Sequence, residues 1–422
     1  MDLPLIDRRT FSQGLAGVTA VGLLASCSKS PTSGGSAGGA AGGGGGGGDT
    51  VTIVALSEYT GIYAELGGEI RQAVELLKDE YNGKVGDYKL EFTFGETQAK
   101  TDEAIRQVKA SVAKGQMLFM GTQLSNIALA ISGAVNRSGG VFCTLAGAPE
   151  VTGEQCKTST FRWSDSTWTA GRQVVQAVMK DKPELKKWFC ITPDYVFGKA
   201  LLESTTDAVK AGGGQVVGNA SHATQETEFS SYLNNAAASG ADVLAILNVG
   251  AQTISTVKQA IQFGLDKKMQ IVIVWSTGLS QFKALGDSME GIYAGAQYWH
   301  GVDTPNNKAL VEACRKKFNT SPSYGLAAAY YQAKSMIAGV ENSGSSKSAD
   351  IIKAMASKPF DGVSGQEVFR PEDHQLIKDY YVLLGKPKGQ RKDAEDLMSV
   401  VAQGDEAQPV SEVGCTLAPL GT

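Results

Sequence analysis

An apolar strand, a polar loop and an amphipathic helix follow one another at the start of the body, and this unit constrains the fold most. The segment Thr50–Leu56 is β-branched and mostly apolar, which is typical of a strand buried on both faces of a parallel sheet. Apolar residues then recur at three- and four-residue steps from Ile70 to Tyr81 and predict a helix. Small ligands bind in such sheets at loops that leave the carboxyl ends of strands, so Tyr59, in the intervening loop, is a candidate ligand contact. Taken alone, the unit fits any α/β domain.

The same alternation of strands and helices continues along the chain and predicts two α/β lobes. Up to Thr144 the pattern is β-α-β-α-β-α-β with short loops, which indicates a doubly wound parallel sheet. The stretch 158–167 interrupts this pattern, which restarts with a helix at 169–179 and runs to a strand that ends at Trp275. A late strand follows at Tyr380–Leu384. Two such lobes joined by several chain crossings form a cleft that opens and closes about hinges.

Charge and motifs exclude several classes of function. The formal net charge of −4 offers no basic surface for nucleic acid. The sequence contains no Gly-x-Ser-x-Gly nucleophile elbow, no GxxxxGK phosphate loop and no GxGxxG fingerprint after a strand. Its three histidines are scattered and no two cysteines show CxxC spacing. We therefore expect no catalytic residues, no cofactor and no metal site.

The first 27 residues are typical of a bacterial export signal. Arg8-Arg9-Thr10-Phe11 matches a twin-arginine signal, and the apolar run Leu15–Ala25 is too short to span a bilayer as a lasting helix. The run ends in Leu24-Ala25-Ser26-Cys27, which resembles a lipobox and predicts cleavage before Cys27 and lipidation of its sulfur. The alternatives are export by the general secretory route and a chance cysteine in a discarded signal peptide.

A stretch of low complexity at residues 28–49 predicts a flexible tether. It is rich in Ser, Gly and Ala, includes the unbroken run Gly42–Gly48, and cannot form a core. A flexible chain of this length has a typical end-to-end distance of roughly 25–30 Å. We therefore expect a body held just off a membrane by a lipid anchor, in the periplasm or at the cell surface.

An odd number of cysteines remains beyond the lipobox. Cys190 lies in an apolar strand pattern and Cys314 in a helix pattern, so both are predicted to be buried thiols. Cys156 and Cys415 lie in polar, loop-like surroundings, and a disulfide between them would pin the C-terminal segment to the body. A Cys143–Cys156 disulfide is the rival pairing.

A series of short motifs, taken in order, carries a resemblance to a known family. The motifs are Ser57…Thr60-Gly61…Gly67, Gly121-Thr122-Gln123-Leu124-Ser125, Ala148-Pro149-Glu150-Val151-Thr152, Phe161-Arg162, Asp194-Tyr195-Val196-Phe197-Gly198, Ala241-Asp242-Val243-Leu244, Pro322…Tyr324…Tyr330, Gly365 and Asp373-His374-Gln375. With these motifs, the chain from Val51 to Leu384 resembles the substrate-binding proteins of bacterial ABC importers of the Leu/Ile/Val-binding type.

The resemblance implies the type 1 periplasmic-binding fold, with two α/β lobes joined by three hinge crossings. We place the crossings near Trp163–Thr167, Tyr298–Val302 and Phe369–Asp373. The first lobe is then predicted to contain residues 50–165 and about 299–370. The second lobe is predicted to contain residues 166–298 and about 371–415.

The family's ligand contacts carry over to several positions. Ser125 matches a serine that helps to hold a carboxylate, and it lies between a strand and a helix, where it can cap the positive helix end; capping alone is the other interpretation. Ala146 and Gly147 match positions that offer backbone groups and allow close approach, or they form an ordinary turn. Phe197 matches an aromatic residue that lies against the ligand, with Tyr195 as its polar neighbour. The other interpretation is that one or both residues belong to the core.

Several positions depart from the family's amino-acid-binding pattern. Leucine-binding members use an acidic residue to pair with the ligand ammonium, whereas the matching position here is Thr277, whose hydroxyl cannot replace that charge. Asn248 begins a loop where a tyrosine is expected, and Leu66 replaces an aromatic residue. Trp275 is able to stack on a planar ligand, although a tryptophan at the end of a strand is more often core. Similar relatives bind amides, urea or aromatic acids, so the ligand is predicted to be one of these or an amino acid.

Three classes of function therefore compete. The first is a monomeric, lipid-anchored receptor that delivers a small polar solute to the subunits of an ABC permease. The second is an enzyme on a similar scaffold, against which the absence of catalytic motifs counts. The third is a sensor that uses the same cleft and acts through a separate signalling protein. The sequence favours the receptor, and the sensor is its main alternative.

Overall fold

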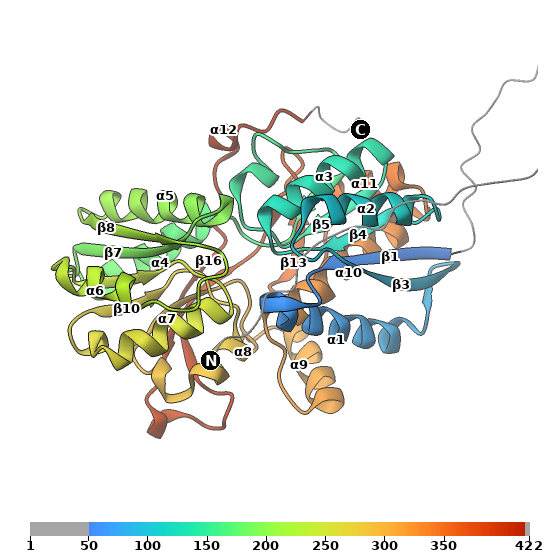
Figure 1. Cartoon of the computed structure of the whole chain (residues 1–422). Helices are drawn as coiled ribbons and strands as arrows, with labels where there is room; N and C mark the ends of the chain where they lie inside the picture. Colours follow the sequence, from blue (N-terminus) through green and yellow to red (C-terminus); the bar gives the residue numbers. More distant parts are fainter. Residues whose placement is uncertain (1–49, 418–422) are drawn as a thin grey trace, which may run out of the picture. The chain divides into compact units, whose positions relative to one another are not determined.

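The computed structural model describes residues 50–417 (Figure 1). The predicted export signal, the predicted lipidation site Cys27 and the predicted tether lie outside the described residues. Residues 50–417 contain two large open sheets and one small sheet. Each large sheet forms a lobe together with the helices packed against it, and we call these the first and second lobes. This arrangement confirms the predicted α/β fold with parallel sheets.

The first lobe is built on a six-stranded sheet. Its strands are parallel except for the edge strand β2, which pairs antiparallel with β3. The spatial order is β2 (Lys84–Val85), β3 (Tyr88–Glu96), β1 (Thr50–Ser57), β4 (Leu118–Gly121), β5 (Val141–Thr144) and β6 (Thr160–Arg162). The central strands β4 and β5 are buried along their whole length, as their apolar sequences predict.

The second lobe is built on a seven-stranded sheet. Its last two strands, β15 and β16, pair antiparallel with their neighbours, and the rest are parallel. The spatial order is β16 (Met398–Gly404), β15 (Tyr380–Gly385), β11 (Tyr293–Ala296), β10 (Gln270–Ile273), β9 (Val243–Ile246), β7 (Lys187–Pro193) and β8 (Gln215–His222). Sequence reasoning does not find β16, because this edge strand exposes Val400 and Val401 and has no apolar alternation.

Helices cover the faces of both sheets (Figure 1). Those of the first lobe are α1 (Ala64–Tyr81), α2 (Thr101–Val112), α3 (Ser125–Ser138), α9 (Pro305–Phe318), α10 (Tyr324–Ser343) and α11 (Ser348–Ser357). Those of the second lobe are α4 (Thr167–Asp181), α5 (Val196–Ala211), α6 (Ser230–Ala238), α7 (Ala251–Gln262) and α8 (Leu279–Leu285), and a short helix α12 (Val410–Val413) follows β16. The chain therefore completes the first lobe only after it has built most of the second.

The helix α10 is the most buried of these elements and anchors the first lobe. Its sequence is apolar around nearly its whole circumference, which is typical of a helix buried on all sides. It packs against α1, α11 and β4. The side chain of Gln332 accepts a hydrogen bond of 3.1 Å from the Gly121 amide at the end of β4. This contact ties the centre of α10 to a strand end that borders the cleft.

Three segments of chain cross between the lobes. The first crossing is 163–166 and the second is 297–304, where the sequence predicts them. The third crossing lies at Lys378 and Asp379, later than the predicted Phe369–Asp373. The predicted stretch instead begins at the last residue of β13 (Gly365–Phe369) and runs into the connection between β13 and β14 (Leu376–Ile377). These strands belong to a small sheet with β12 (Phe360–Gly362).

A buried arginine explains why the third crossing comes late. The guanidinium of Arg162, at the end of β6, donates hydrogen bonds to the side chain of Gln375 (2.5 Å), the Ala148 carbonyl (2.6 Å) and the Thr152 hydroxyl (2.6 Å). The backbones of Gln375 and Arg162 also form an isolated parallel β-bridge at the edge of the first sheet. Burial lowers the pKa of Arg162 to about 10. These contacts hold the chain on the first lobe until Lys378.

One ion pair joins all three crossings. The ammonium of Lys378, in the third crossing, lies 2.5 Å from the carboxylate of Asp165, in the first. Gln297 lies in the second crossing. Its side-chain oxygen accepts a hydrogen bond from the backbone amide of Asp165 (2.8 Å), and its backbone carbonyl accepts one from the Lys378 ammonium (3.0 Å). All three residues are buried. We call Asp165, Gln297 and Lys378 the hinge cluster.

The disulfide in the structure joins Cys156 and Cys415, with 5.7 Å between their Cα atoms. It connects the loop after β5 to the segment after α12. The rival partner Cys143 is a free thiol buried in β5, and Cys190 and Cys314 are also buried free thiols.

Replacement of Lys378 by methionine tests the hinge cluster. Lys378→Met leaves the Asp165 carboxylate buried without its partner, so the free energy of unfolding should fall by about 3–5 kcal/mol. Urea denaturation followed by circular dichroism measures the change. Lys388→Met breaks the exposed Lys388–Asp287 ion pair and should leave the unfolding midpoint unchanged. Equal effects of the two substitutions would contradict the assigned role of the hinge cluster.

Candidate functional site

The candidate site is a small cavity where the carboxyl ends of strands from both lobes meet. It has a volume of about 10 Å³, close to that of one water molecule. We call it the interlobe cavity. It is lined by Gln123, Leu124, Leu145, Gly147, Tyr195, Phe197, Val249, Trp275 and Tyr324. Eight of these residues follow the strands β4, β5, β7, β9 and β10, and Tyr324 begins α10. This is the place where α/β sheets bind small ligands.

Gly147 allows the two lobes to approach each other at the cavity. A Cβ atom on Gly147 would lie 2.6 and 3.0 Å from two atoms of the Trp275 ring and 3.1 Å from the Phe197 ring. The Phe197 and Trp275 rings pack edge to face with their centroids 5.0 Å apart, and Tyr195 stacks on Phe197 at 5.8 Å. Aromatic side chains of the second lobe therefore rest on a backbone position of the first lobe where no larger residue fits.

A second contact between the lobes lies beside the cavity. The Ser323 hydroxyl, which precedes α10 in the first lobe, donates to the Thr277 carbonyl of the second lobe (2.9 Å). The Ser280 amide donates to the Ser323 hydroxyl at 3.1 Å. The hydroxyl of Thr277 is buried without a hydrogen-bond partner among the described residues. Thr277 thus contributes its backbone to contact between the lobes, and its side chain does not line the cavity.

The structure brings three of the predicted ligand contacts together at the cavity, namely Gly147, Tyr195 and Phe197. Ser125 and Ala146 lie just behind its wall. The Ser125 hydroxyl accepts a hydrogen bond of 3.2 Å from the Ala148 amide, and the Ala146 amide donates to the Thr144 hydroxyl at 3.2 Å. Both contacts shape the loop that presents Gly147.

Two further predicted contacts lie away from the cavity wall. Asn248 is buried in a network with His222 (2.8 Å) and Thr256 (2.8 Å), and its neighbour Val249 lines the cavity instead. The hydroxyl of Tyr59 donates to the Ala55 carbonyl at 3.1 Å. The Arg71 guanidinium lies 4.4 Å from the Tyr59 ring centroid. This side chain therefore packs on the first lobe.

Several lining residues are not assigned by sequence reasoning. Gln123, Leu124, Leu145 and Val249 each follow the end of a parallel strand, and that position is the signal that identifies them. Tyr324 has no such signal, because it begins a helix far along the chain. Only the return of α10 to the first lobe places it in the cavity.

Within residues 50–417, no charged side chain lines the interlobe cavity. Glu58, at the end of β1, is buried, and its carboxylate accepts hydrogen bonds from the hydroxyls of Thr97 (2.7 Å) and Thr122 (2.8 Å). Burial raises the pKa of Glu58, against the opposing effect of these hydrogen bonds. The wall of the cavity is therefore aromatic, aliphatic and amide in character.

A buried acid supports the first turn of α10 from behind. Glu69 of α1 packs so closely against Gly325 that a Cβ atom there would lie 2.4 Å from its carboxylate oxygen. Burial raises the pKa of Glu69 from 4.5 to about 8. Because Gly325 follows Tyr324, the acid lies behind the part of the cavity wall that Tyr324 forms.

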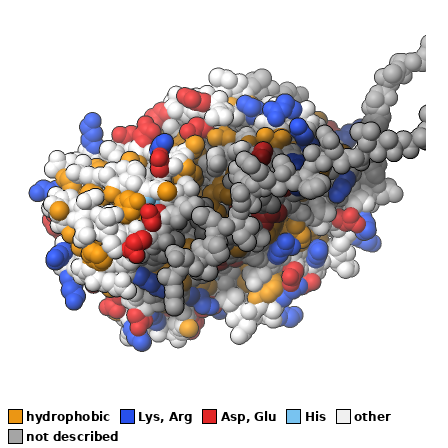
Figure 2. Space-filling model, viewed as in Figure 1, with side chains coloured by type: hydrophobic (Ala, Val, Ile, Leu, Met, Phe, Trp, Pro, Cys, Tyr) orange, Lys and Arg blue, Asp and Glu red, His pale blue; other side chains and the backbone are white. Residues whose placement is uncertain are grey.

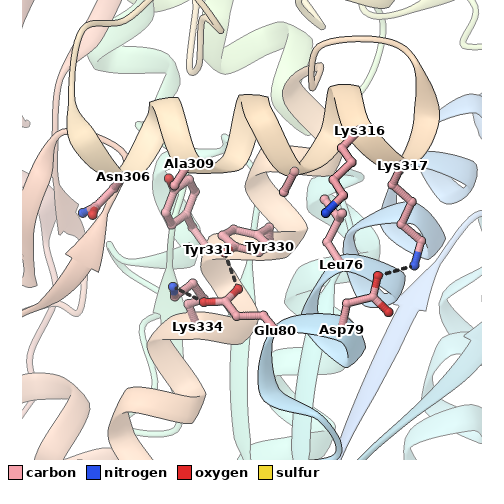
Figure 3. A pocket seen from close by; sticks show the side chains of 11 residues that line it. Leu76, Asp79, Glu80, Asn306, Ala309, Lys316, Lys317, Tyr330, Tyr331 and Lys334 are labelled. Carbon is pink, nitrogen blue, oxygen red and sulfur yellow. Dashed lines mark hydrogen bonds and ion pairs between the residues drawn. The ribbon is translucent and has the colours of Figure 1, made fainter.

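A larger cavity of about 660 Å³ lies between α1, α9 and α10 (Figure 3). Its acidic groups are already paired, since Asp79 contacts Lys317 at 2.6 Å and Glu80 contacts Lys334 at 2.8 Å and the Tyr330 hydroxyl. It is not at the carboxyl ends of the strands. We therefore place the candidate site in the smaller interlobe cavity.

Charges of both signs are interspersed over the face shown in Figure 2. That face carries no broad basic patch, which agrees with the small net charge. Among residues 50–417, no helix has the length and apolar content needed to cross a membrane.

A family model described as periplasmic binding protein matches residues 50–390. The chain belongs to this family. It is 23% identical over 344 residues to the Leu/Ile/Val-binding protein homolog 6 of Brucella melitensis, a match that covers 79% of this chain and 87% of that protein. Members of the periplasmic binding family are substrate-binding components of ABC transporters.

Solved structures of periplasmic binding proteins share this fold. An amino acid ABC transporter substrate-binding protein from Pseudomonas fluorescens Pf-5 is 40% identical, with a TM-score of 0.84 over 87% of this chain and 99% of that one. A solute-binding protein of an ABC transporter from R. palustris, in complex with benzoate, is 22% identical, with a TM-score of 0.78 over 87% of this chain and 100% of that one. The predicted resemblance and the two-lobed fold are thus confirmed.

The raised pKa of Glu69 predicts a pH-dependent stability. From about pH 4.5 to about 8 the unfolded chain releases a proton that folded Glu69 keeps, so this group lowers the free energy of unfolding as pH rises. Glu69→Gln mimics the protonated acid and should therefore gain stability relative to the wild type as pH rises from 4 to 9. Thermal unfolding at pH 4, 6.5 and 9 measures this difference.

The control is Glu75→Gln, on the exposed side of the same helix. Its stability relative to the wild type should stay nearly constant over the same pH range. A Glu69→Gln difference that is also constant would show that Glu69 is ionised in the folded protein, contrary to the prediction.

Proposed function

We propose that this protein is a receptor that captures a small solute in the interlobe cavity and delivers it, chemically unchanged, to an ABC permease. The observation that carries the proposal is the convergence of strand ends from both lobes on one cavity, closed by Trp275 and Phe197 over Gly147. Membership of the periplasmic binding family supports it. The solute class proposed from the family is an amino acid, an amide, urea or an aromatic acid.

Capture requires relative movement of the lobes. In the described conformation the aromatic side chains fill the cavity almost completely, so a solute enters only when the lobes separate or these side chains turn. The hinge cluster joins the three crossings and provides the pivot. Closure then removes the solute from water and strengthens its polar contacts.

We further propose that a lipid on Cys27 anchors the receptor outside the cytoplasm. The support is the lipobox-like sequence Leu24-Ala25-Ser26-Cys27 and the Gly-rich segment that follows it. The paired arginines Arg8-Arg9 favour the twin-arginine route, with the general secretory route as the alternative. A tether between the anchor and the body would let the body turn toward its permease.

The anchor is tested by Cys27→Ser. The wild-type chain, expressed in a bacterium that processes lipoproteins, should fractionate with membranes and carry an acylated N-terminal cysteine by mass spectrometry. The Cys27→Ser chain should lack this acyl mass and leave the membrane fraction. Cys190→Ser, which alters a buried thiol of the body, is the control and should remain acylated. Identical N-terminal masses for the wild type and Cys27→Ser would refute lipidation.

The receptor function is tested at Gly147. A methyl group there would overlap the Trp275 ring, so Gly147→Ala should hold the lobes apart and weaken solute binding by about tenfold or more, as expected for an overpacked contact of 1–3 kcal/mol. Isothermal titration with the solutes named above measures binding.

The matched control is Gly68→Ala in α1. A Cβ atom at Gly68 meets no atom within 4 Å, so this variant should bind solute like the wild type. Unchanged binding by Gly147→Ala would remove this position from the site. Failure of the wild type to bind any solute of the panel would refute the proposed class of ligand.

A further inference from the structure

The chemical character of the interlobe cavity limits the charge of its ligand. All nine lining residues are uncharged, and four of them are aromatic. An ammonium group moved from water into such a site requires a carboxylate or a set of acceptors to offset its desolvation. The cavity wall supplies no carboxylate.

Of three buried acidic groups in this part of the protein, two are committed to other partners and the third lies behind the cavity wall. Asp165 pairs with Lys378 at 2.5 Å. Glu58 accepts hydrogen bonds from the hydroxyls of Thr97 and Thr122, and it does not line the cavity. Glu69 packs against the first turn of α10, behind the wall that Tyr324 forms. None of these carboxyls faces the space in which a ligand is enclosed.

One hydrogen-bond donor among the lining residues, in contrast, is unpaired. The side-chain nitrogen of Gln123 is buried and has no hydrogen-bond partner among residues 50–417, although the residue lines the cavity. A buried donor left unpaired costs free energy, so a ligand that accepts its hydrogen bond binds favourably. Gln123 also lies two residues before α3, a helix of 14 residues that begins at Ser125 and has its positive end here. The unpaired nitrogen of Gln123 and the positive end of α3 both favour binding of an anionic oxygen of a ligand.

The rest of the cavity is suited to an uncharged group. Trp275 and Phe197 present their rings edge to face, and Leu124, Leu145 and Val249 add aliphatic surface. Aromatic and aliphatic walls of this kind bind planar or branched apolar groups.

We propose that the ligand is a small carboxylate without an ammonium group, such as an aromatic acid or a 2-oxo acid. Its carboxylate accepts from Gln123 at the start of α3, and its uncharged end lies between Trp275 and Phe197. This inference rests on the proposed receptor function and adds the class of solute. It separates this chain from receptors that bind zwitterionic amino acids.

Matched pairs of ligands test the inference on the full mature chain. Phenylpyruvate and phenylalanine differ only in a carbonyl against an ammonium, as do 4-methyl-2-oxopentanoate and leucine, and benzoate is a carboxylate without either group. Isothermal titration should show each oxo acid binding at least about tenfold more tightly than its amino acid, and benzoate should also bind.

Two outcomes would overturn the inference, and they are distinguishable. Binding of the amino acids as tightly as the oxo acids, or more tightly, would refute it while the receptor function stands. No binding of any compound, including amides and urea, would refute both. If amino acids bind, Glu58→Gln shows whether that buried acid is the missing partner, because the substitution would then abolish their binding.

Substitutions in the cavity give an independent readout. Gln123→Glu keeps the side-chain shape but replaces the donor by a carboxylate, so the affinity for the oxo acids should fall by about tenfold or more, while weak binding of the amino acids should not fall. Trp275→Ala should lower the affinity for phenylpyruvate more than the affinity for 4-methyl-2-oxopentanoate. Trp168→Ala, outside the cavity, is the control and should bind both as the wild type does. Equal losses for oxo and amino acids in Gln123→Glu would contradict the assigned role of Gln123.

Discussion

The buried contact between the Lys378 ammonium and the Asp165 carboxylate is the interaction on which the two-lobed structure depends. The contact joins the first and third crossings. Gln297 connects the second crossing to them, because it accepts hydrogen bonds from both Asp165 and Lys378. The ammonium also lies 4.8 Å from the centroid of the Trp163 ring. Because a buried charge needs its partner, this contact holds the three crossings together.

Closure at the cleft depends on a small residue rather than on charge. The aromatic rings of Trp275 and Phe197 reach the first lobe only because Gly147 has no side chain. A pair of aromatic rings contributes about 0.5–1.5 kcal/mol, so contacts of this kind favour closure only modestly. A receptor that must release its solute to a permease needs such a balance, since very stable closure would retain the solute.

The two cavities show why volume is a poor guide to the site in this protein. The large cavity between α1, α9 and α10 has acidic groups that already pair with Lys317 and Lys334. The interlobe cavity is far smaller, yet it is lined by four aromatic residues and by Gln123, whose side-chain nitrogen has no hydrogen-bond partner among residues 50–417. Unsatisfied donors and apolar walls identify a ligand site because a ligand can stabilise them.

The sequence by itself determined the alternation of strands and helices, the first two crossings and part of the cavity wall. Strand burial and helix periodicity are local patterns, and cavity-lining residues such as Gly147 and Phe197 occupy strand ends and helix starts. The Cys156–Cys415 pairing was one of two alternatives, and the burial of Cys143 in β5 separates them.

Only the tertiary structure decided the rest. Arg162 keeps Gln375 on the first lobe and so delays the third crossing, and Tyr324 enters the cavity because α10 returns from far along the chain. Ser125 and Asn248 have residue types suited to ligands, but their side chains bond to Ala148 and to His222 and Thr256. The physical reason is that a polar side chain bonds to whichever partner lies nearest in space, and neighbours distant in sequence leave no local pattern.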